Sequence, residues 1–160
     1  KLIKRIIMIR VNVEIKNKPW FLKIKDPNKY FNNKAKKISN SLNFFKEKNI
    51  NFTILLTNSL NIKKLNKKFR KKNKHTDVLS FPFFEKKYLK KIKEKKVYVG
   101  DVAICYEVIK LRSKKKNFDE ELDKVWIHGL LHLLGYDHIK NNDYFKMSKI
   151  EKKLLNIIRK

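Results

Sequence analysis

The spacing of apolar residues predicts a strand and then a helix in the first third of the chain. Ile9, Val11, Val13 and Ile15 alternate with polar or charged residues, which is typical of a half-buried strand. Pro19 and the segment 26–28, Asp-Pro-Asn, indicate a loop. Apolar residues then recur at spacings of four and three, which predicts an amphipathic helix carrying Phe31, Ala35, Ile38, Leu42 and Phe45.

Residues 52–82 follow a strand–helix–strand pattern. The apolar run at 52–57 predicts a short buried strand, and Asn58 or Ser59 is a suitable N-cap for the helix after it. That helix carries Ile62, Leu65 and Phe69. Residues 77–81 again have strand character, and Pro82 stops this strand because proline has no backbone N–H.

A lysine-rich connection separates this unit from the next strand. We expect residues 85–96 to be solvated and residues 97–104 to form a strand that is interrupted at Gly100 and Asp101. A short helix is predicted at 107–116.

Two longer helices complete the pattern. Asn117 and Glu120 form a capping-box-like start for the first, and its acidic first turn complements the helix dipole. The last helix starts at Asn142 or Asp143 and carries Phe145, Ile150, Leu154 and Ile158. The prediction is a single α+β domain over residues 1–160, with a small sheet of about four strands and about five helices. The strand order stays open.

Basic residues greatly outnumber acidic ones. The chain has 42 Lys and Arg against 15 Asp and Glu, which gives a formal net charge of +27. This excess favours polyanionic partners, among them RNA, DNA and anionic membranes. Most of the cations are lysines, and lysine, asparagine and isoleucine have A/T-rich codons, so genome composition is a second explanation. The few arginines are therefore informative, and they stand at positions 5, 10, 70, 112 and 159.

The single cysteine, Cys105, excludes a disulfide within the chain and fits a reducing cytoplasm. We expect its thiol to pack in the core. No apolar run has the length of a membrane span, and charges interrupt the first ten residues too often for the apolar core of a signal peptide. These features predict a cytoplasmic protein without a membrane partner.

Three of the four histidines lie close together, in the segment HGLLHLLGYDH at 128–138. His128 and His132 are one turn apart and share a face of the predicted helix. Gly135 can take the left-handed conformation that ends a helix, and the returning chain then brings His138 toward the other two. Three converging imidazoles with a free fourth position suit one catalytic Zn²⁺ per chain.

The alternative is that each histidine has its own hydrogen-bond partner in the core. The helix is apolar on nearly all sides, so it is buried and its imidazoles need partners. A shared metal ion satisfies both imidazoles of the helix, those of His128 and His132, at once. This favours the metal site.

Gly129 distinguishes this segment from zinc peptidases. The metzincin pattern H-E-x-x-H-x-x-G-x-x-H has a glutamate after the first histidine as general base. Gly129 stands there instead, which disfavours a peptidase. A hydrolase with this site relies on the metal, because bound zinc lowers the pKa of water to about 7.

Three blocks of sequence together resemble one known family. They are LNKKFRKKNKHTDVLSFPF at 65–83, GDVAICYEV at 100–108 and HGLLHLLGYDH at 128–138. In this order they resemble the bacterial endoribonuclease and rRNA maturation factor family known as YbeY, over nearly the whole chain. The last block is the most specific, the first is strong, and the middle one is weak by itself.

The resemblance implies an α+β domain with a zinc site in a basic cleft. It implies that His128, His132 and His138 are the metal ligands and that Arg70 is a functional arginine lining the cleft. It also implies processing of ribosomal RNA, notably at the 3′ end of the small-subunit RNA, and ribosome quality control. The expected partners are single-stranded RNA and the small ribosomal subunit, with no DNA.

RNA cleavage needs a nucleophile and a group that neutralises charge on the phosphate. We expect Arg70 and His128 to be catalytic. A metal held by His128 can supply the nucleophile, and the guanidinium of Arg70 can bind phosphate oxygens with paired N–H donors. Lysine cannot reproduce those paired donors. Lys71, Lys72 and Tyr136 are further candidates for RNA contact. Tyr136 could stack on a base, but packing within the protein is the favoured interpretation of this residue.

A non-catalytic function is the main alternative. In that case the metal is structural, and the basic surface binds rRNA during ribosome assembly. Structural zinc usually has four protein ligands, so this alternative needs a fourth, for which His75 and Cys105 are candidates. Asp137 either orients a ligand histidine or forms the turn before His138; the sequence supports both equally.

Overall fold

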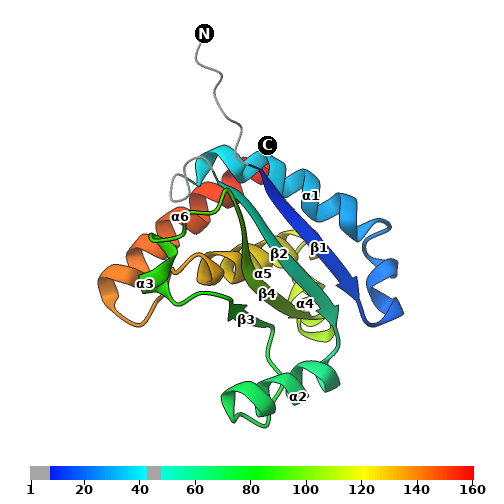
Figure 1. Ribbon diagram of the computed structural model, residues 1–160. Coiled ribbons are helices and arrows are strands. Elements are labelled where there is room, and N and C mark those ends of the chain that lie inside the picture. The colour runs from blue at the N-terminus through cyan, green and yellow to red at the C-terminus, as the bar shows by residue number, and fades with distance from the viewer. Residues whose placement is uncertain (1–7, 43–47) are drawn as a thin grey trace.

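Four strands form a mixed sheet in the spatial order β1-β2-β4-β3 within the part of the chain that the structure describes (Figure 1). The computed structural model describes residues 8–42 and 48–160. Strands β1, β2 and β4 are parallel, and β3 runs antiparallel to β4 at one edge. The bounds are Ile9–Ile15 for β1, Asn49–Thr57 for β2, Val78–Pro82 for β3 and Lys96–Cys105 for β4.

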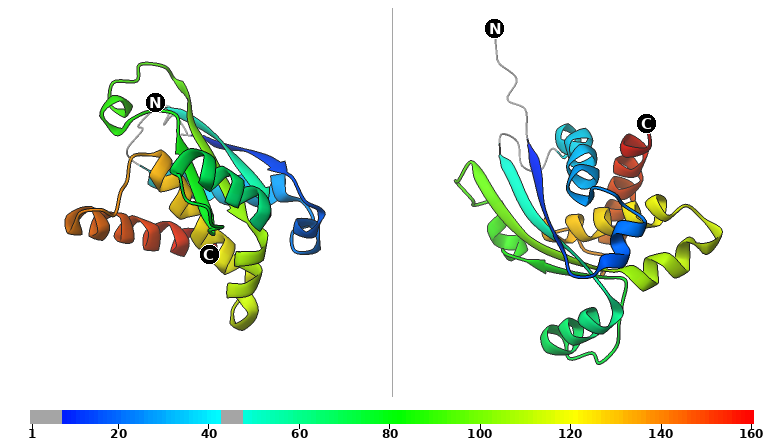
Figure 2. Two further views of the ribbon diagram at one scale, coloured as in Figure 1. Left: turned by 90° about the horizontal axis from the view of Figure 1, so that it is seen from below. Right: turned by 90° about the vertical axis from the view of Figure 1, so that its right-hand side faces the viewer.

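Most of the helical mass covers one face of this sheet. Helices α1, α5 and α6 lie on that face, whereas α2 packs against β3 and β4 at one end of the other (Figure 2). The α-helices are α1 (Pro27–Ile38), α2 (Ser59–Arg70), α3 (Lys86–Leu89), α4 (Tyr106–Arg112), α5 (Phe118–Leu133) and α6 (Asn141–Arg159). Short 3-10 helices are η1 (Lys18–Leu22), η2 (Ser39–Ser41) and η4 (Ser113–Lys115).

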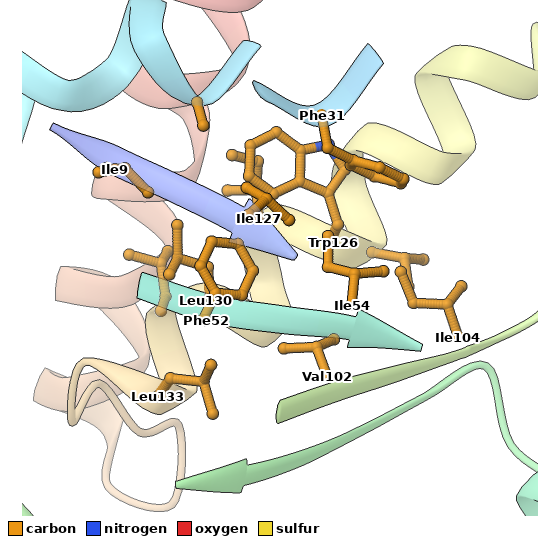
Figure 3. Packing of buried hydrophobic residues seen from close by; sticks show 14 of the residues in the cluster. Ile9, Phe31, Phe52, Ile54, Val102, Ile104, Trp126, Ile127, Leu130 and Leu133 are labelled. Carbon is orange, nitrogen blue, oxygen red and sulfur yellow. The ribbon is translucent and has the colours of Figure 1, made fainter. Parts of the chain in front are cut away.

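The main core lies between the sheet and the three helices that cover it (Figure 3). Trp126 of α5 and Phe31 of α1 are fully buried there in a T-shaped contact, with ring centroids 5.9 Å apart. A second, smaller cluster lies under α2 and consists of Ile62, Leu79, Ala103 and Cys105. The prediction that the Cys105 thiol packs in a core is therefore confirmed.

The first predicted helix differs from the structure at both ends. Segment 26–28 starts the helix, because the Asp26 side chain accepts a hydrogen bond from Lys29 N–H and Pro27 occupies the first turn. The helix ends at Ile38, and Leu42 reaches the core from beyond η2. The predicted position of Phe45 lies outside the described residues.

The lysine-rich connection is not wholly solvated. It contains the short helix α3, whose Leu89 packs into the main core. Strand β4 also continues through Gly100, where a β-bulge shifts the register between Asn51 and Phe52 of β2. The backbone of Gly100 has a φ of +135°, and a Cβ there would lie 2.2 Å from the Phe81 carbonyl oxygen. The bulge needs glycine, which explains the apparent interruption.

The apolar face of α6 is narrower than its sequence pattern predicted. Leu154 and Ile158 are buried, but Phe145 is 68% exposed, so its assignment to the core-facing side was wrong. Among the described helices, none is both long and apolar enough to cross a membrane.

Candidate metal centre

Helix α5 carries the first two histidines of the site. Its N-cap is Asn117, as predicted, whose side chain accepts a hydrogen bond from Asp119 N–H. His128 and His132 lie one turn apart on its partly buried face. Apart from Lys124 and the two histidines, the residues at 121–133 are all buried, against the sheet or against neighbouring helices, so the packing of α5 determines which way both histidines face.

The turn after α5 returns the chain toward the helix. Gly135 has a φ of +89°, as its predicted left-handed conformation requires. Its N–H donates to the His132 carbonyl at 3.1 Å, and Tyr136 N–H donates to the Leu131 carbonyl at 3.0 Å. These two bonds form a Schellman motif, which ends the helix and directs the chain to His138.

The three histidine rings converge. Their centroids are 4.6 Å apart for His128 and His132, 5.0 Å for His132 and His138, and 5.6 Å for His128 and His138. One ring nitrogen of each lies within 4.8 Å of the others, so the cluster could hold a metal ion. Nε2 of His128 and Nε2 of His132 are 3.0 Å apart. Tetrahedral zinc sets such nitrogens about 3.3 Å apart, so this pair is spaced as two ligands of one metal ion would be.

Burial keeps His132 ready to act as a ligand. Desolvation lowers the pKa of its imidazole, and the neighbouring His128 and His138 lower it further. A lower pKa keeps the ring neutral at neutral pH, and a neutral ring has the lone pair that a metal needs.

Glu151 belongs to the site, although sequence reasoning missed it. Its Oε1 lies 2.5 Å from Nδ1 of His128. A carboxylate at Nδ1 holds the proton there and leaves Nε2 free to face the other histidines. The two residues lie 23 positions apart on different helices, so no local spacing predicts the contact. The one available sign was an acid among the lysines at 149–153.

The packing of α5 on the sheet explains Gly129. A Cβ at this position would lie 2.6 Å from Cγ1 of Val102 and 3.3 Å from Oγ of Ser80. The Ser80 hydroxyl also donates to the Gly129 carbonyl at 3.1 Å. The helix approaches the sheet too closely for any side chain, so the glutamate of the metzincin pattern has no room here.

A cleft of about 740 Å³ opens beside the histidines. Arg70, at the end of α2, lines it together with all three histidines, Tyr136 and Phe83. The Arg70 Nη2 donates to the carbonyl of Ser80 in β3 at 3.2 Å, which anchors its side chain at the cleft. The structure thus brings Arg70 into one cleft with histidines that lie about sixty residues later in the sequence.

The other sequence candidates divide into two groups. Tyr136 lines the cleft but is half-buried, and burial raises the pKa of its phenol. Asp137 accepts a hydrogen bond from His138 N–H at 2.7 Å, which supports its turn-forming interpretation. Lys71 and Lys72 are exposed after α2 and are not among the residues that line the cleft.

No fourth ligand joins the histidines within the described residues. The cluster contains His128, His132 and His138 alone. His75 is exposed after α2, and Cys105 is buried under the same helix. The candidate fourth ligands are therefore not brought to the site.

Comparisons with known proteins agree with this geometry. The family model described as Endoribonuclease YbeY matches residues 14–159. An Endoribonuclease YbeY from Pelagibacter ubique (strain HTCC1062) is 46% identical over 157 residues, covering 95% of this chain and 97% of the relative. Another, from Ehrlichia canis (strain Jake), is 36% identical and covers 93% of this chain and 92% of the relative.

A solved structure has the same fold. The solution structure of TM1509 from Thermotoga maritima superposes with a TM-score of 0.61 at 26% identity, covering 94% of this chain and 89% of that one. The match of the family model over most of the chain, the two relatives and the three-histidine cluster lead to one assignment. The chain belongs to the YbeY endoribonuclease family of RNA hydrolases.

Proposed function

We propose that this protein is a zinc-dependent endoribonuclease that cleaves single-stranded RNA. Its substrate is ribosomal RNA, in the 3′-end maturation of the small-subunit RNA and in ribosome quality control, with the small subunit as partner and the cytoplasm as location. One domain over residues 1–160 carries the activity. The observation that supports this most is the cleft shared by Arg70 and the three histidines.

The ligand set would be His128, His132 and His138. When bound, zinc would supply Lewis-acid chemistry at a phosphoryl oxygen and a more acidic water. Neutral His132, with its lowered pKa, needs no proton to leave before it binds a metal. Glu151, beside Nδ1 of His128, would hold the proton on that nitrogen and leave Nε2 as the atom that binds the metal.

Arg70 would bind the phosphate oxygens of the RNA. A guanidinium has five N–H donors in a fixed plane, and the bond to the Ser80 carbonyl uses one of them. That bond positions the group, and the remaining donors are available for a phosphate. As negative charge grows on the phosphate during cleavage, these bonds strengthen and stabilise the transition state.

The alternative of a structural metal in an assembly factor is less well supported. Structural zinc usually has four protein ligands, and the described residues offer three at this cluster. The open position favours a catalytic metal. The charge of +27 is compatible with rRNA binding in either case.

The decisive experiment compares metal-replete wild type with His132→Ala on a defined single-stranded RNA, after stringent removal of contaminating nucleases. We expect the variant to lose cleavage. His75→Ala is the matched control, because His75 is exposed outside the cluster and should leave activity and metal content unchanged. Equal cleavage by wild type and His132→Ala would contradict the proposal, as would equal cleavage of a duplex of the same sequence.

A further inference from the structure

An exposed aromatic ring lies in the cleft. Phe83 follows directly after β3 and lines the cleft together with Arg70 and the histidines. It is 68% exposed, so most of its ring surface is in contact with solvent. Tyr136, the aromatic residue that the sequence offered as a candidate for stacking, is half-buried. Phe83 therefore offers more free ring surface to a ligand in the cleft.

The position of Phe83 is fixed by its neighbours. Its backbone N–H donates to the Val99 carbonyl at 2.9 Å, at the bulge of β4. Its ring makes T-shaped contacts with Phe84, at 5.1 Å between centroids, and with Tyr98, at 6.1 Å. Phe84 in turn packs against the main core. A ring supported in this way is preorganised, so a ligand that stacks on it loses little free energy to ordering.

We propose that Phe83 is the base-stacking platform of this cleft. A base of single-stranded RNA stacks on its ring while the neighbouring phosphate is bound by Arg70 at the histidine site. The inference rests on the proposed function and adds to it the residue that selects single strands. Unpaired bases can leave their stack and pack on an aromatic side chain, whereas bases within a duplex cannot.

The test uses Phe83→Leu, which keeps an apolar side chain and removes the ring. The probe is a single-stranded RNA with 2-aminopurine near the cleavage site, cut under single-turnover conditions. We expect the half-saturating protein concentration to rise about 5- to 150-fold, the effect of losing one stacked base. The maximal rate should change little, and the quenching of 2-aminopurine on binding should be lost. Phe83→Trp should restore both.

Phe145→Leu is the matched control. Phe145 is also 68% exposed but lies on α6, and it is not among the residues that line the cleft. Unchanged half-saturation and quenching in Phe83→Leu would overturn the inference, and so would an equal loss in Phe145→Leu. If Phe83→Leu has a lowered melting temperature, Phe83→Trp tests the inference instead. Stacking predicts that Phe83→Trp binds the probe as tightly as wild type or more tightly, with stronger quenching.

The two proposals can fail separately. If wild type binds the probe with quenching but never cuts it, the ribonuclease proposal is contradicted. The stacking inference is then decided by whether Phe83→Leu loses the quenching. Wild type that cuts the probe, with Phe83→Leu equally efficient, contradicts the stacking inference only.

Discussion

Glu151 on α6 and His128 on α5 are joined by a contact of 2.5 Å between Oε1 and Nδ1. This contact connects α6 to the candidate metal centre on α5. Since a carboxylate beside Nδ1 favours the proton on that nitrogen, the packing of α6 against α5 brings a group of one helix to a candidate ligand on the other. The site therefore depends on two helices and the turn between them.

Removing this carboxylate should weaken metal binding. We expect Glu151→Ala to lower zinc affinity about 10- to 100-fold, the usual effect of losing such a partner, and Glu151→Gln to fall between it and wild type. Competition with a chelator measures the affinity. Asp143→Asn, an acid at the start of the same helix, is the control. Wild-type affinity in Glu151→Ala would show that the contact does not orient His128.

Arg70→Lys should lose most of the RNA cleavage. Lysine keeps the charge but not the planar set of donors, and losing one stabilising donor costs about 10²–10³ in rate. Metal content and melting temperature should stay near wild type. Arg112→Lys is the control, because Arg112 forms a partly exposed ion pair with Asp77 at 2.6 Å. The measurement is the single-turnover cleavage rate of each variant. A fully active Arg70→Lys would show that Arg70 has a structural role only.

Gly129→Ala should destabilise the protein although alanine favours helices. Replacing glycine with alanine inside a helix stabilises the helix by about 1 kcal/mol through its higher helix propensity. The added Cβ would lie 2.6 Å from Cγ1 of the buried Val102, and overpacking of this kind costs about 1–3 kcal/mol. Urea denaturation should therefore show a lower free energy of unfolding.

Val102→Ala supplies the control for this substitution. Removing the Val102 methyl groups should relieve the clash, so Gly129→Ala should cost less in the Val102→Ala background than in wild type. Equal costs in both backgrounds would mean that the two residues do not interact.

High pH should destabilise the protein through Tyr30. Burial, with Asp123 and Asp119 nearby, raises the pKa of Tyr30 far above its ordinary value. Its hydroxyl donates to Asp123 Oδ1 at 2.9 Å, a bond that needs the proton. The raised pKa stabilises the fold below pH 10, and this stabilisation is lost as pH rises above the unfolded value of about 10.

The measurement is the free energy of unfolding between pH 9 and about 11. It should fall by up to about 1.4 kcal/mol per pH unit for this one group. Tyr30→Phe should be less stable at pH 9 and show a correspondingly smaller slope. The same slope in Tyr30→Phe as in wild type would assign the loss to other groups.

Local features of this protein could be predicted from sequence because their causes lie within a few residues. The strand at 9–15 follows from alternation, and the Asn117 cap and the Gly135 turn follow from backbone chemistry. The three-histidine cluster was predictable for the same reason, since a helix and one turn position all its members.

The remaining features depend on packing between distant segments. The strand order, the contact of Glu151 with His128 and the exposed ring of Phe83 all require knowing which elements lie side by side. Phe145 shows the limit of periodicity, because an apolar residue at helical spacing can still face solvent. Gly129 shows the same limit. The absence of the metzincin glutamate is visible in the sequence, but the reason for a glycine there, the close approach of α5 to Val102, lies in another element.

Strand β3 leaves one edge of the sheet without a neighbouring strand in the described part of the chain, and such edges invite aggregation. At three positions of β3, the backbone groups that face away from β4 are not available to pair with another strand. Asp77 Oδ1 accepts from Val78 N–H at 2.8 Å, Arg70 donates to the Ser80 carbonyl, and Pro82 has no N–H to offer. The arginine that faces the cleft thus also protects this edge from pairing with a strand of another molecule.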